Sequence, residues 1–555
     1  MTCSLIGQSQ CMECPVLSGQ GTQPAIMNNR LHTLIQHLQS ADCFPHATSD
    51  FEVFETHISY VLLTGEYVYK FKKPVDLGFL DFTTLEKRKY YCEEELRLNR
   101  RLAPEMYLAV VSVHGDAKHP VVEGKGPLLE YAVKMQQFDT ADRMDLVTAR
   151  GELIESHIDQ LAELVADFHE HIPIAGKDTH FGTLEVIRGR IMQNFEQVMQ
   201  HTDDAEISSM CQQVCAWSEA ALDKRRDLIA QRKQQGSVRE CHGDMHMANI
   251  ILPAGKPVIY DCIEFSEDLR WIDTMSEVAF LYMDLDFHQQ HRLALCFLNE
   301  YLSRNGDYGG LGMWCIYLVY RAMVRAKVNS IGARQQAAEP KKAAEYLTTT
   351  RKYLALARNY IESFASPVLI ILHGLSGSGK TWLAEQLRES YGAIQIRSDV
   401  ERKRLLGFSA ETKTKSAVGK GAYSADMTSQ TYQRLLDLAG LIVKVGPSVI
   451  VDATFLKQSH RDQFRNLAHK LKVPFVILDI QASEAVLRSR ITKRAEFDKD
   501  ASEATLAVLE QQLKSQESLT EDEETYTIHI DTEKSFELER LAQQIKSLTS
   551  QQKTT

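Results

Sequence analysis

The chain has 555 residues, of which 44% are hydrophobic and 25% are charged, an ordinary globular composition. It is too long for one ordinary domain, so two or three domains are expected. The formal net charge of -11 argues against a general binder of nucleic acid or acidic membranes. No apolar stretch is long enough to cross a bilayer and no secretion signal opens the sequence, so we expect a cytoplasmic protein.

The N-terminal stretch is polar, and we predict a disordered tail over residues 1–27. Cys11 and Cys14 form a C-x-x-C pair there, with no second pair nearby. Structural zinc needs four ligands, so a metal or redox site remains one alternative and a loose tail the other. Scattered cysteines in a long chain favour reduced thiols over a disulfide framework.

The next part of the sequence, from about residue 50 to 135, alternates β-like segments with one charged helix. Strands are expected at 58–63, 67–71 and 108–113, and the helix at 85–102. Lys70 and Lys72 point to the same face of the second strand, because side chains alternate along a strand. Residues from about 150 to 360 are mainly helical, and their last helix ends before the Ser366-Pro367 breaker.

A first chemical motif interrupts the helical part. Residues 242–249 read His-Gly-Asp-Met-His-Met-Ala-Asn, and Asp261 follows a short apolar segment. Kinase chemistry needs a carboxylate that orients the acceptor hydroxyl, followed by an amide and a second carboxylate that hold Mg²⁺. Asp244, Asn249 and Asp261 supply these groups in that order. Each alone has a simpler explanation as a turn former, a cap or a strand end.

This pattern resembles the aminoglycoside phosphotransferase-like branch of the protein-kinase superfold. The resemblance implies that Asp244 is the catalytic base and that Asn249 and Asp261 are Mg²⁺ ligands. It also implies that Asp273 steadies the catalytic loop. His246 has no role in the resemblance and is either a metal ligand or a hydrogen-bonded side chain.

The same resemblance implies a strand lysine over the ATP phosphates and a helix glutamate that holds it. Lys70 is the candidate lysine, with Lys72 as the fallback. Glu95 is the candidate glutamate, and Glu93 and Glu94 are its rivals. The sequence departs from the protein-kinase pattern in two places, since it lacks a glycine-rich loop near residues 58–67 and reads Asp-Cys-Ile-Glu at 261–264. Glu264 either adds a metal ligand or pairs with Arg270.

From Pro367 onward, strands and helices alternate, which predicts a parallel sheet flanked by helices. Strands are expected at 368–372, 393–396, 448–451, 475–480 and 527–530. The first strand leads into a complete G-x-x-x-x-G-K-[ST] phosphate loop, made of Gly374, Leu375, Ser376, Gly377, Ser378, Gly379, Lys380 and Thr381. Its backbone N–H groups would cradle phosphates, Lys380 would reach the β- and γ-phosphates, and Thr381 would hold Mg²⁺. The loop predicts ATP binding.

Two acids follow strands of this second part. Asp452 ends an apolar strand in the form of a Walker B segment, which holds Mg²⁺. Asp399 lies just past another strand, where α/β sheets bind ligands, or it caps the next helix.

These residues resemble the small P-loop kinases that include zeta toxin, gluconate kinase, adenylylsulfate kinase and polynucleotide 5′-kinase. The resemblance implies that Asp399 is an acceptor base, that Arg402 touches an anionic acceptor, and that Arg490 or Arg494 closes over the triphosphate. Basic residues crowd the acceptor side and favour an anionic substrate: Arg397, Arg402, Lys403, Arg404, Lys413, Lys415 and Lys420.

The predicted fold is an α+β protein-kinase-like bilobal domain followed by an α/β P-loop NTPase domain with a parallel sheet. The expected boundaries are 28–363 for the first domain, with lobes at about 45–138 and 139–363, then 364–548 for the second and a tail at 549–555. The predicted function is that of an ATP- and Mg²⁺-dependent kinase, bifunctional if both halves act, on small-molecule hydroxyl acceptors. The alternatives are a regulatory ATPase with a kinase-fold binding module, or a polynucleotide 5′-kinase, which the net acidity disfavours.

Overall fold

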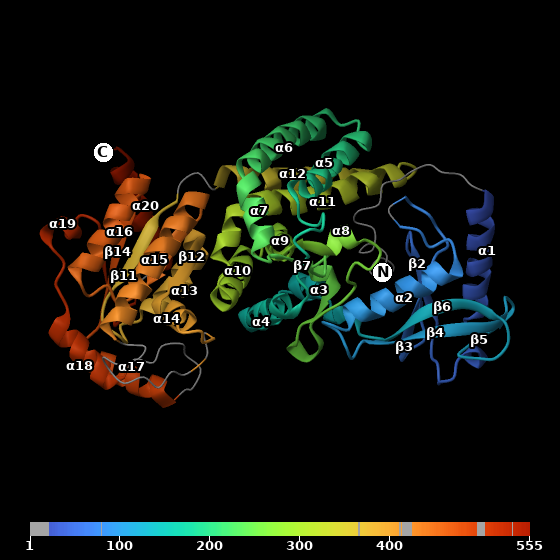
Figure 1. The fold of residues 1–555 in the computed structure, drawn as a ribbon, viewed down its shortest axis with the longest axis horizontal. Coiled ribbons are helices and arrows are strands. Elements are labelled where there is room, and N and C mark those ends of the chain that lie inside the picture. The colour runs from blue at the N-terminus through green and yellow to red at the C-terminus, as the bar shows by residue number, and fades with distance from the viewer. Residues whose placement is uncertain are drawn as a thin grey trace. The chain divides into compact units, whose positions relative to one another are not determined.

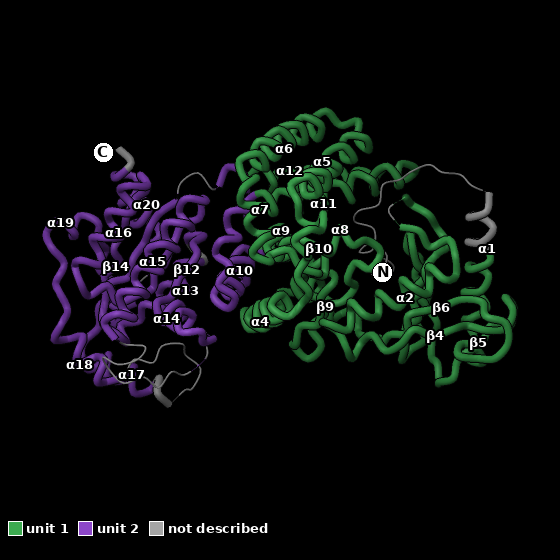
Figure 2. The backbone as a smooth tube through the Cα atoms, in the orientation of Figure 1, with its two compact units in different colours: residues 1–289, 316–359 green, residues 290–315, 360–555 purple. Residues whose placement is uncertain are grey.

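The computed structural model describes residues 22–78, 80–363, 367–409, 412, 424–496, 505–535 and 537–554. The chain divides into two compact units, shown in two colours in Figure 2. Unit 1 contains Met1–Gln289 and Ile316–Asn359, and unit 2 contains Gln290–Cys315 and Tyr360–Thr555. Residues 290–315, which we assigned to the first domain, therefore group with the phosphate-loop part of the chain. Cys11, Cys14, Lys413, Lys415 and Lys420 lie outside the described residues.

Unit 1 begins with an antiparallel sheet whose strand order is β1-β2-β3-β6-β4-β5. Its strands are β1 (Glu52–Glu55), β2 (Ser59–Leu63), β3 (Tyr67–Lys72), β4 (Tyr107–Asp116), β5 (His119–Val122) and β6 (Leu128–Gln136). The three predicted strands are present as β2, β3 and β4, but β6, which lies between β3 and β4, was not predicted. Helices α1 (Thr22–His37) and α2 (Leu85–Asn99) accompany the sheet, and α2 runs alongside it in Figure 1. Because α1 starts at Thr22, the predicted tail over 1–27 is too long.

The rest of unit 1 is mainly helical, as predicted. Its helices are α3 (Met144–Ala149), α4 (Glu155–His171), α5 (Leu184–Gln200), α6 (Ala205–Lys224), α7 (Arg226–Gln234), α8 (Glu267–Arg270), α9 (Thr274–Phe287), α11 (Trp314–Gln335) and α12 (Pro340–Ser363). The unit boundary falls within α11 and α12. Two small antiparallel ribbons frame the His-Gly-Asp motif: β7 (Val238–Glu240) pairs with β10 (Trp271–Asp273), and β8 (Ile250–Ile251) pairs with β9 (Val258–Ile259).

Unit 2 is built on a parallel sheet whose strand order is β12-β13-β11-β14-β15. The strands are β11 (Leu369–His373), β12 (Ala393–Arg397), β13 (Ser448–Asp452), β14 (Phe475–Gln481) and β15 (Thr527–Asp531), which confirms all five predicted strands to within a residue or so. Strands β11, β12, β13 and β14 are almost entirely buried, as expected of a parallel sheet covered on both faces, whereas the edge strand β15 is only partly buried.

The helices of unit 2 are α10 (His291–Asn305), α13 (Lys380–Tyr391), α14 (Ser398–Leu405), α15 (Ala425–Val445), α16 (Gln458–Leu471), α17 (Glu484–Glu496), α18 (Leu506–Ser515), α19 (Glu521–Glu524) and α20 (Leu538–Thr554). Helices α13 and α20 pack together against one face of the sheet (Figure 1). The predicted tail at 549–555 is wrong, because α20 continues to Thr554 and Gln552 binds the backbone of Phe475.

One edge of this sheet is closed by a side chain from α10. Asn299 Nδ2 donates to the carbonyl oxygen of Ala393 at 3.2 Å, and its Oδ1 accepts from the N–H of Gln395 at 2.8 Å. The amide thus binds two backbone groups of β12 as a neighbouring strand would. This contact explains why α10 groups with unit 2 even though it precedes α11 and α12 in the chain.

Candidate active sites

A buried glutamate on α2 holds two lysines of β3. The distance from Lys70 Nζ to Glu95 Oε1 is 2.6 Å, and that from Lys72 Nζ to Glu95 Oε2 is 2.7 Å. Burial alone would raise the pKa of Glu95, but the two ammonium groups outweigh it and lower the pKa to about 2. The rivals lie elsewhere: Glu94 binds Arg97, and Glu93 lies near Lys89 on the exposed side of the helix.

The two lysines differ in their second partners. Lys70 Nζ lies 2.8 Å from Asp261 Oδ1, whereas Lys72 binds Glu264. The side chain of Glu264 therefore pairs with a lysine, and only its backbone oxygen accepts from Arg270. Asp261 has a φ of +66°, a left-handed conformation that is uncommon for residues other than glycine and that clusters at functional sites. Its N–H donates to the hydroxyl of Tyr107 at 3.2 Å.

The His-Gly-Asp-x-x-x-x-Asn segment forms a compact loop around a buried carboxylate. Asn249 Nδ2 donates to Asp244 Oδ2 at 3.1 Å and to the backbone oxygen of Asp244 at 3.0 Å. His246 Nε2 lies 3.4 Å from the same Oδ2. Burial tends to raise the pKa of Asp244, but the nearby histidines and Arg325 shift it below its ordinary value, so the carboxylate is ionised at neutral pH.

The amide oxygen of Asn249 provides a test of the expected metal site. This Oδ1 atom is buried and has no hydrogen-bond partner within the described part of the chain. Buried polar atoms normally have partners, so an orphaned acceptor on a side chain bound to the carboxylate of Asp244 fits a cation ligand. Asn249 and Asp261 together supply the oxygen donors that Mg²⁺ prefers, and the donor set fits that ion.

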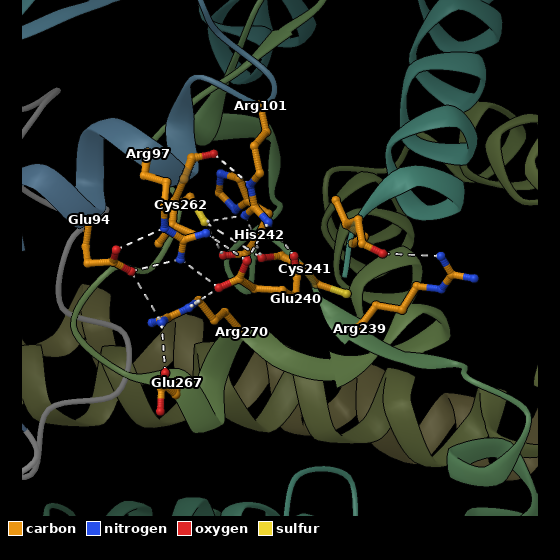
Figure 3. A network of polar contacts seen from close by, with 12 residues as sticks. Glu94, Arg97, Arg101, Arg239, Glu240, Cys241, His242, Cys262, Glu267 and Arg270 are labelled. Carbon is orange, nitrogen blue, oxygen red and sulfur yellow. Dashed lines mark hydrogen bonds and ion pairs between the residues drawn. The ribbon is translucent and has the colours of Figure 1, made fainter. Parts of the chain in front are cut away.

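A network of charged residues ties α2 to the strand that precedes the loop (Figure 3). Glu240 at the end of β7 accepts from Arg97 Nη2 at 2.8 Å and from Arg270 Nε at 3.2 Å. Arg101, which follows α2, donates to the backbone oxygens of Glu240 and Cys241 at 2.6 and 3.1 Å. The helix that carries Glu95 is therefore fixed directly to the start of the catalytic loop.

Asp273 does not contact the loop in the described structure. Its carboxylate is bound by Arg232, with Nε–Oδ2 and Nη2–Oδ1 distances of 2.6 and 2.7 Å. It also caps α9 at the N–H of Met275 and accepts from the hydroxyl of Tyr317. The role of Asp273 in steadying the catalytic loop stays a prediction, and the contacts described above anchor the start of α9.

The phosphate loop connects β11 to α13 in the strand-loop-helix order that its motif requires. Gly374 has a φ of +145°, and a Cβ atom there would meet the backbone oxygen of Ile480 at 2.4 Å, so only glycine fits. Gly377 and Gly379 also have positive φ angles, of +86° and +99°. Lys380 Nζ donates to the backbone oxygen of Leu375 at 2.7 Å. The loop is a backbone cradle for an anion at a helix N-terminus.

The Walker B acid lies beside the loop. Asp452 is buried at the end of β13, and burial raises its pKa above the ordinary value despite a hydrogen bond from the hydroxyl of Thr381. Gln395 Nε2 also donates to Asp452 Oδ2 at 3.1 Å. Thr381 and Asp452 thus bring a hydroxyl and a carboxylate together, which is the donor pair of a P-loop Mg²⁺ site.

Sequence profiles of two families match these two parts of the chain. The profile described as "Phosphotransferase enzyme family" matches residues 89–314, and the one described as "AAA domain" matches residues 369–519. Uncharacterized proteins of Mycobacterium tuberculosis and Mycobacterium bovis are 30% identical to this chain over 470 residues, covering 84% of this chain and 91% of each relative. The chain belongs to their family. In this chain a phosphotransferase domain precedes a P-loop domain.

Solved structures resemble the two parts of this family member only partially. A choline/ethanolamine kinase family protein from Mesorhizobium loti is 11% identical, with a TM-score of 0.36, over 59% of this chain and 99% of that chain. A gluconokinase from Sinorhizobium meliloti is 20% identical, with a TM-score of 0.23, over 34% of this chain and 92% of that chain. Scores this low carry no argument about function. No helix in the described residues is long and apolar enough to cross a membrane.

The residues predicted to bind the acceptor or to close over the triphosphate in the P-loop domain have different surroundings. Asp399 is the second residue of α14, not its cap, and its Oδ1 accepts from Arg402 Nη1 at 2.9 Å. Arg490 Nη1 donates to the backbone oxygens of Gly377 and Ser378 at 3.3 and 3.2 Å, so its side chain is hydrogen-bonded to the phosphate loop itself. The side chain of Arg494 lies outside the described residues.

Several residues that contact the sites were not predicted from the sequence. Gln512 on α18 accepts from the N–H of Ser376 at 2.9 Å, inside the phosphate loop. Glu277 and Asp284 are buried acids in the otherwise mostly apolar helix α9, and each accepts a backbone N–H of the catalytic loop. Glu277 and Asp284 lie seven residues apart, on one face of the helix, but this spacing alone does not show which backbone groups they bind.

Proposed function

We propose that this protein is an ATP- and Mg²⁺-dependent kinase that transfers the γ-phosphate to small hydroxyl-bearing acceptors. The observation that carries the proposal is the arrangement around Asp244, whose carboxylate is buried, ionised and bound on Oδ2 by the amide of Asn249. A carboxylate fixed in this way can orient an acceptor hydroxyl and take its proton. Lys70, which joins Glu95 to Asp261, supports the same proposal.

In the phosphotransferase domain, Lys70 would hold the α- and β-phosphates, and Asn249 and Asp261 would hold Mg²⁺. ATP with Mg²⁺, when bound, supplies the phosphoryl group and neutralises part of its charge. Asp244 orients the acceptor hydroxyl and holds its proton. The domain contributes mainly by positioning, and so the accuracy of this loop governs the rate.

We infer a second acceptor site in the P-loop domain, which would make the enzyme bifunctional. Lys380 would reach the β- and γ-phosphates, Thr381 and Asp452 would hold Mg²⁺, and Asp399 would orient the acceptor. The Asp399–Arg402 pair supports an anionic acceptor, because Arg402 supplies a guanidinium beside the carboxylate. The contacts of Arg490 with the loop backbone favour a role in shaping the cradle. We propose a cytoplasmic location, where ATP and small acceptors are available.

The decisive experiment is transfer of labelled γ-phosphate from ATP into a pooled metabolite extract. Wild type, Asp244→Ala and Lys380→Ala are compared side by side. A labelled product that disappears in only one variant assigns its formation to that domain. Release of free phosphate alone, unchanged by the extract, would instead identify a regulatory ATPase, and labelling of DNA or RNA ends that weakens with salt would identify a polynucleotide kinase.

A further inference from the structure

Helix α9 carries a glutamate that binds the backbone directly before the proposed catalytic base. Glu277 Oε1 accepts the N–H of Gly243 at 2.6 Å, and Glu277 Oε2 is bound by His169 Nε2 at 2.9 Å. Glu277 is fully buried. Hydrogen bonds to a buried carboxylate are roughly twice as strong as those between neutral groups. The position of Gly243 is therefore set by α9.

The same helix binds the loop a second time, on the other side of Asp244. Asp284 Oδ2 accepts the N–H of Met247 at 2.9 Å, and the side chain is 3% exposed. Glu277 and Asp284 are seven residues apart, which places them two turns, or about 10.5 Å, apart on one face of the helix. Two rigidly spaced carboxylates thus bracket the residue that orients the acceptor.

Gly243 is held by a second charged side chain as well. Arg321 Nη1 donates to the backbone oxygen of Gly243 at 3.2 Å. Gly243 has a φ of +90°, and a Cβ atom there would lie 2.7 Å from the backbone oxygen of Leu269. Both backbone polar groups of Gly243 are therefore held by buried charged side chains, in a conformation that only glycine adopts without strain.

Electrostatics support the arrangement. Burial by itself raises the pKa of both acids, but His169 and the Gly243 N–H help lower that of Glu277 to about 2, and Arg325 is the main group that lowers that of Asp284. Other charged or titratable groups that act on Asp284 are His288 and His246. Both carboxylates therefore remain acceptors across the physiological range.

We propose that Glu277 and Asp284 are positioning residues that fix Asp244 through the backbone amides of Gly243 and Met247. This inference rests on the proposed function of Asp244. The two acids touch neither the nucleotide phosphates nor the acceptor in this role. They hold the carboxylate of Asp244 where it can take the proton of the acceptor hydroxyl, and a shift of about 1 Å in that position costs about 100-fold in rate.

A metal centre is the competing explanation for one of these acids. Ligand atoms of His169, Cys241 and Glu277 all lie within 4.8 Å of one another. However, structural zinc takes four ligands, and both oxygens of Glu277 already accept hydrogen bonds. We therefore assign the group to hydrogen bonding. Metal analysis of the purified full chain separates the two, because stoichiometric zinc that Cys241→Ser removes would overturn the assignment.

The activity test uses Lys380→Ala as the parent, so that labelled transfer into the metabolite extract reports the phosphotransferase domain alone. Glu277→Ala and Asp284→Ala in this parent are expected to lower kcat by about 100-fold with little change in KM for ATP. Glu277→Gln and Asp284→Asn keep a carbonyl acceptor for each N–H and are expected to restore most of the rate. If the alanine and amide variants are equally impaired, the backbone-holding role is wrong.

Glu130→Ala is the matched control for loss of a buried acid. Glu130 is 4% exposed and pairs with Arg88 at 2.8 Å, on β6 and α2, away from the loop. It is expected to lower the melting temperature without lowering kcat of the folded protein. A loss of kcat in Glu130→Ala equal to that in Glu277→Ala would show that the effect is general destabilisation and would overturn the proposal.

Amide hydrogen exchange of peptides covering residues 241–249 provides a readout that needs no acceptor. Exchange there is expected to accelerate in Glu277→Ala and Asp284→Ala, to stay near the parent rate in the amide variants, and to be unchanged in Glu130→Ala. If the parent transfers no phosphate, the proposed function fails while this exchange pattern still decides the positioning role. Unchanged exchange in both alanine variants would overturn the inference alone.

Discussion

Lys70 and Glu95 form a buried ion pair, with 2.6 Å between Nζ and Oε1. Lys72 occupies the other oxygen of the same carboxylate, so two lysines share one glutamate and each has a further acid of its own. The ion pairs form a chain from Asp261, at the proposed metal site, through Lys70, Glu95 and Lys72 to Glu264. The two lysines therefore differ: Lys70 contacts the proposed metal ligand Asp261, whereas Lys72 contacts Glu264.

We predict different phenotypes for the two lysines. Lys70→Met should abolish transfer by the phosphotransferase domain, because it removes the group that links Glu95 to Asp261. Lys72→Met should mainly destabilise unit 1, by about 3–5 kcal/mol, because it leaves the buried Glu264 without its ion-pair partner. Urea unfolding measures the loss of stability, and labelled phosphate transfer in the Lys380→Ala background measures the loss of activity. Lys72→Met combined with Glu264→Leu should recover stability, and equal loss of transfer in both single variants would contradict the division of roles.

A second prediction concerns the orphaned amide oxygen of Asn249. Asn249→Ala removes this oxygen and the Nδ2 donor of Asp244, so the Mg²⁺ concentration needed for half-maximal transfer should rise and kcat should fall. The measurement is a titration of free Mg²⁺ at fixed ATP in the Lys380→Ala background. Asn194→Ala is the control, since Asn194 is a buried amide that donates to the backbone oxygen of Arg190 in its own helix. An unchanged Mg²⁺ dependence in Asn249→Ala would remove Asn249 from the metal site.

The sequence identified the elements of the fold where a single element carries its own signal. Strands β11, β13 and β14 of unit 2 are nearly continuous apolar runs, as is usual in parallel sheets, while β12 and β15 alternate apolar and polar residues, and all five are present. Strand β6 was missed although its apolar residues Leu129, Tyr131, Val133 and Met135 alternate along one face, as in a strand. The placement of α10 was also missed. Its residues pack on β12 and α13 of unit 2, and periodicity reveals that a helix has a buried face without revealing what covers it.

In the candidate sites, too, some residues carry a signal in the sequence and others are recognised only from their contacts. Glu95 was singled out from three consecutive glutamates by resemblance alone, although the buried stripe of α2, formed by Arg88, Cys92, Glu95 and Asn99, gives a physical reason for it. Glu277 and Asp284 belong to no motif, because a backbone amide imposes no residue type on its acceptor beyond an oxygen atom. Contacts of this kind become visible only when the loop and the helix are seen together.

Asn299 provides a test of how α10 supports the P-loop sheet. Asn299→Leu keeps the size of the side chain but leaves the backbone groups at Ala393 and Gln395 without partners, at a cost of about 1–3 kcal/mol for each buried group. Unit 2 should unfold at lower urea concentration, and the exposed edge of β12 should promote aggregation. Urea unfolding measures the stability of unit 2, and light scattering measures aggregation. Asn329→Leu, at an amide of unit 1, is the control, and stability of unit 2 equal to wild type would show that the clamp is dispensable.

The last prediction follows from a ladder of side chains across three strands of unit 2. His373 Nδ1 lies 2.6 Å from Asp479 Oδ1, and His529 Nδ1 lies 2.8 Å from Asp479 Oδ2. Glu524 lies 2.8 Å from the other nitrogen of His529. Partial burial alone would lower the pKa of His529, but the two carboxylates outweigh it and raise the pKa above its ordinary value.

A histidine with a raised pKa in the folded state stabilises the protein when it is protonated. Its contribution is fully present below about pH 6.5, the ordinary pKa, and is lost as the pH rises through the higher folded pKa. His529→Gln should therefore lower the free energy of unfolding at pH 6 and change it little at pH 9. The pKa of Asp479 is lowered, so that group stays ionised over this range and adds no pH dependence. Urea unfolding of unit 2 at both pH values measures the difference, and a larger effect at pH 9 than at pH 6 would show that the two acids do not stabilise the protonated ring.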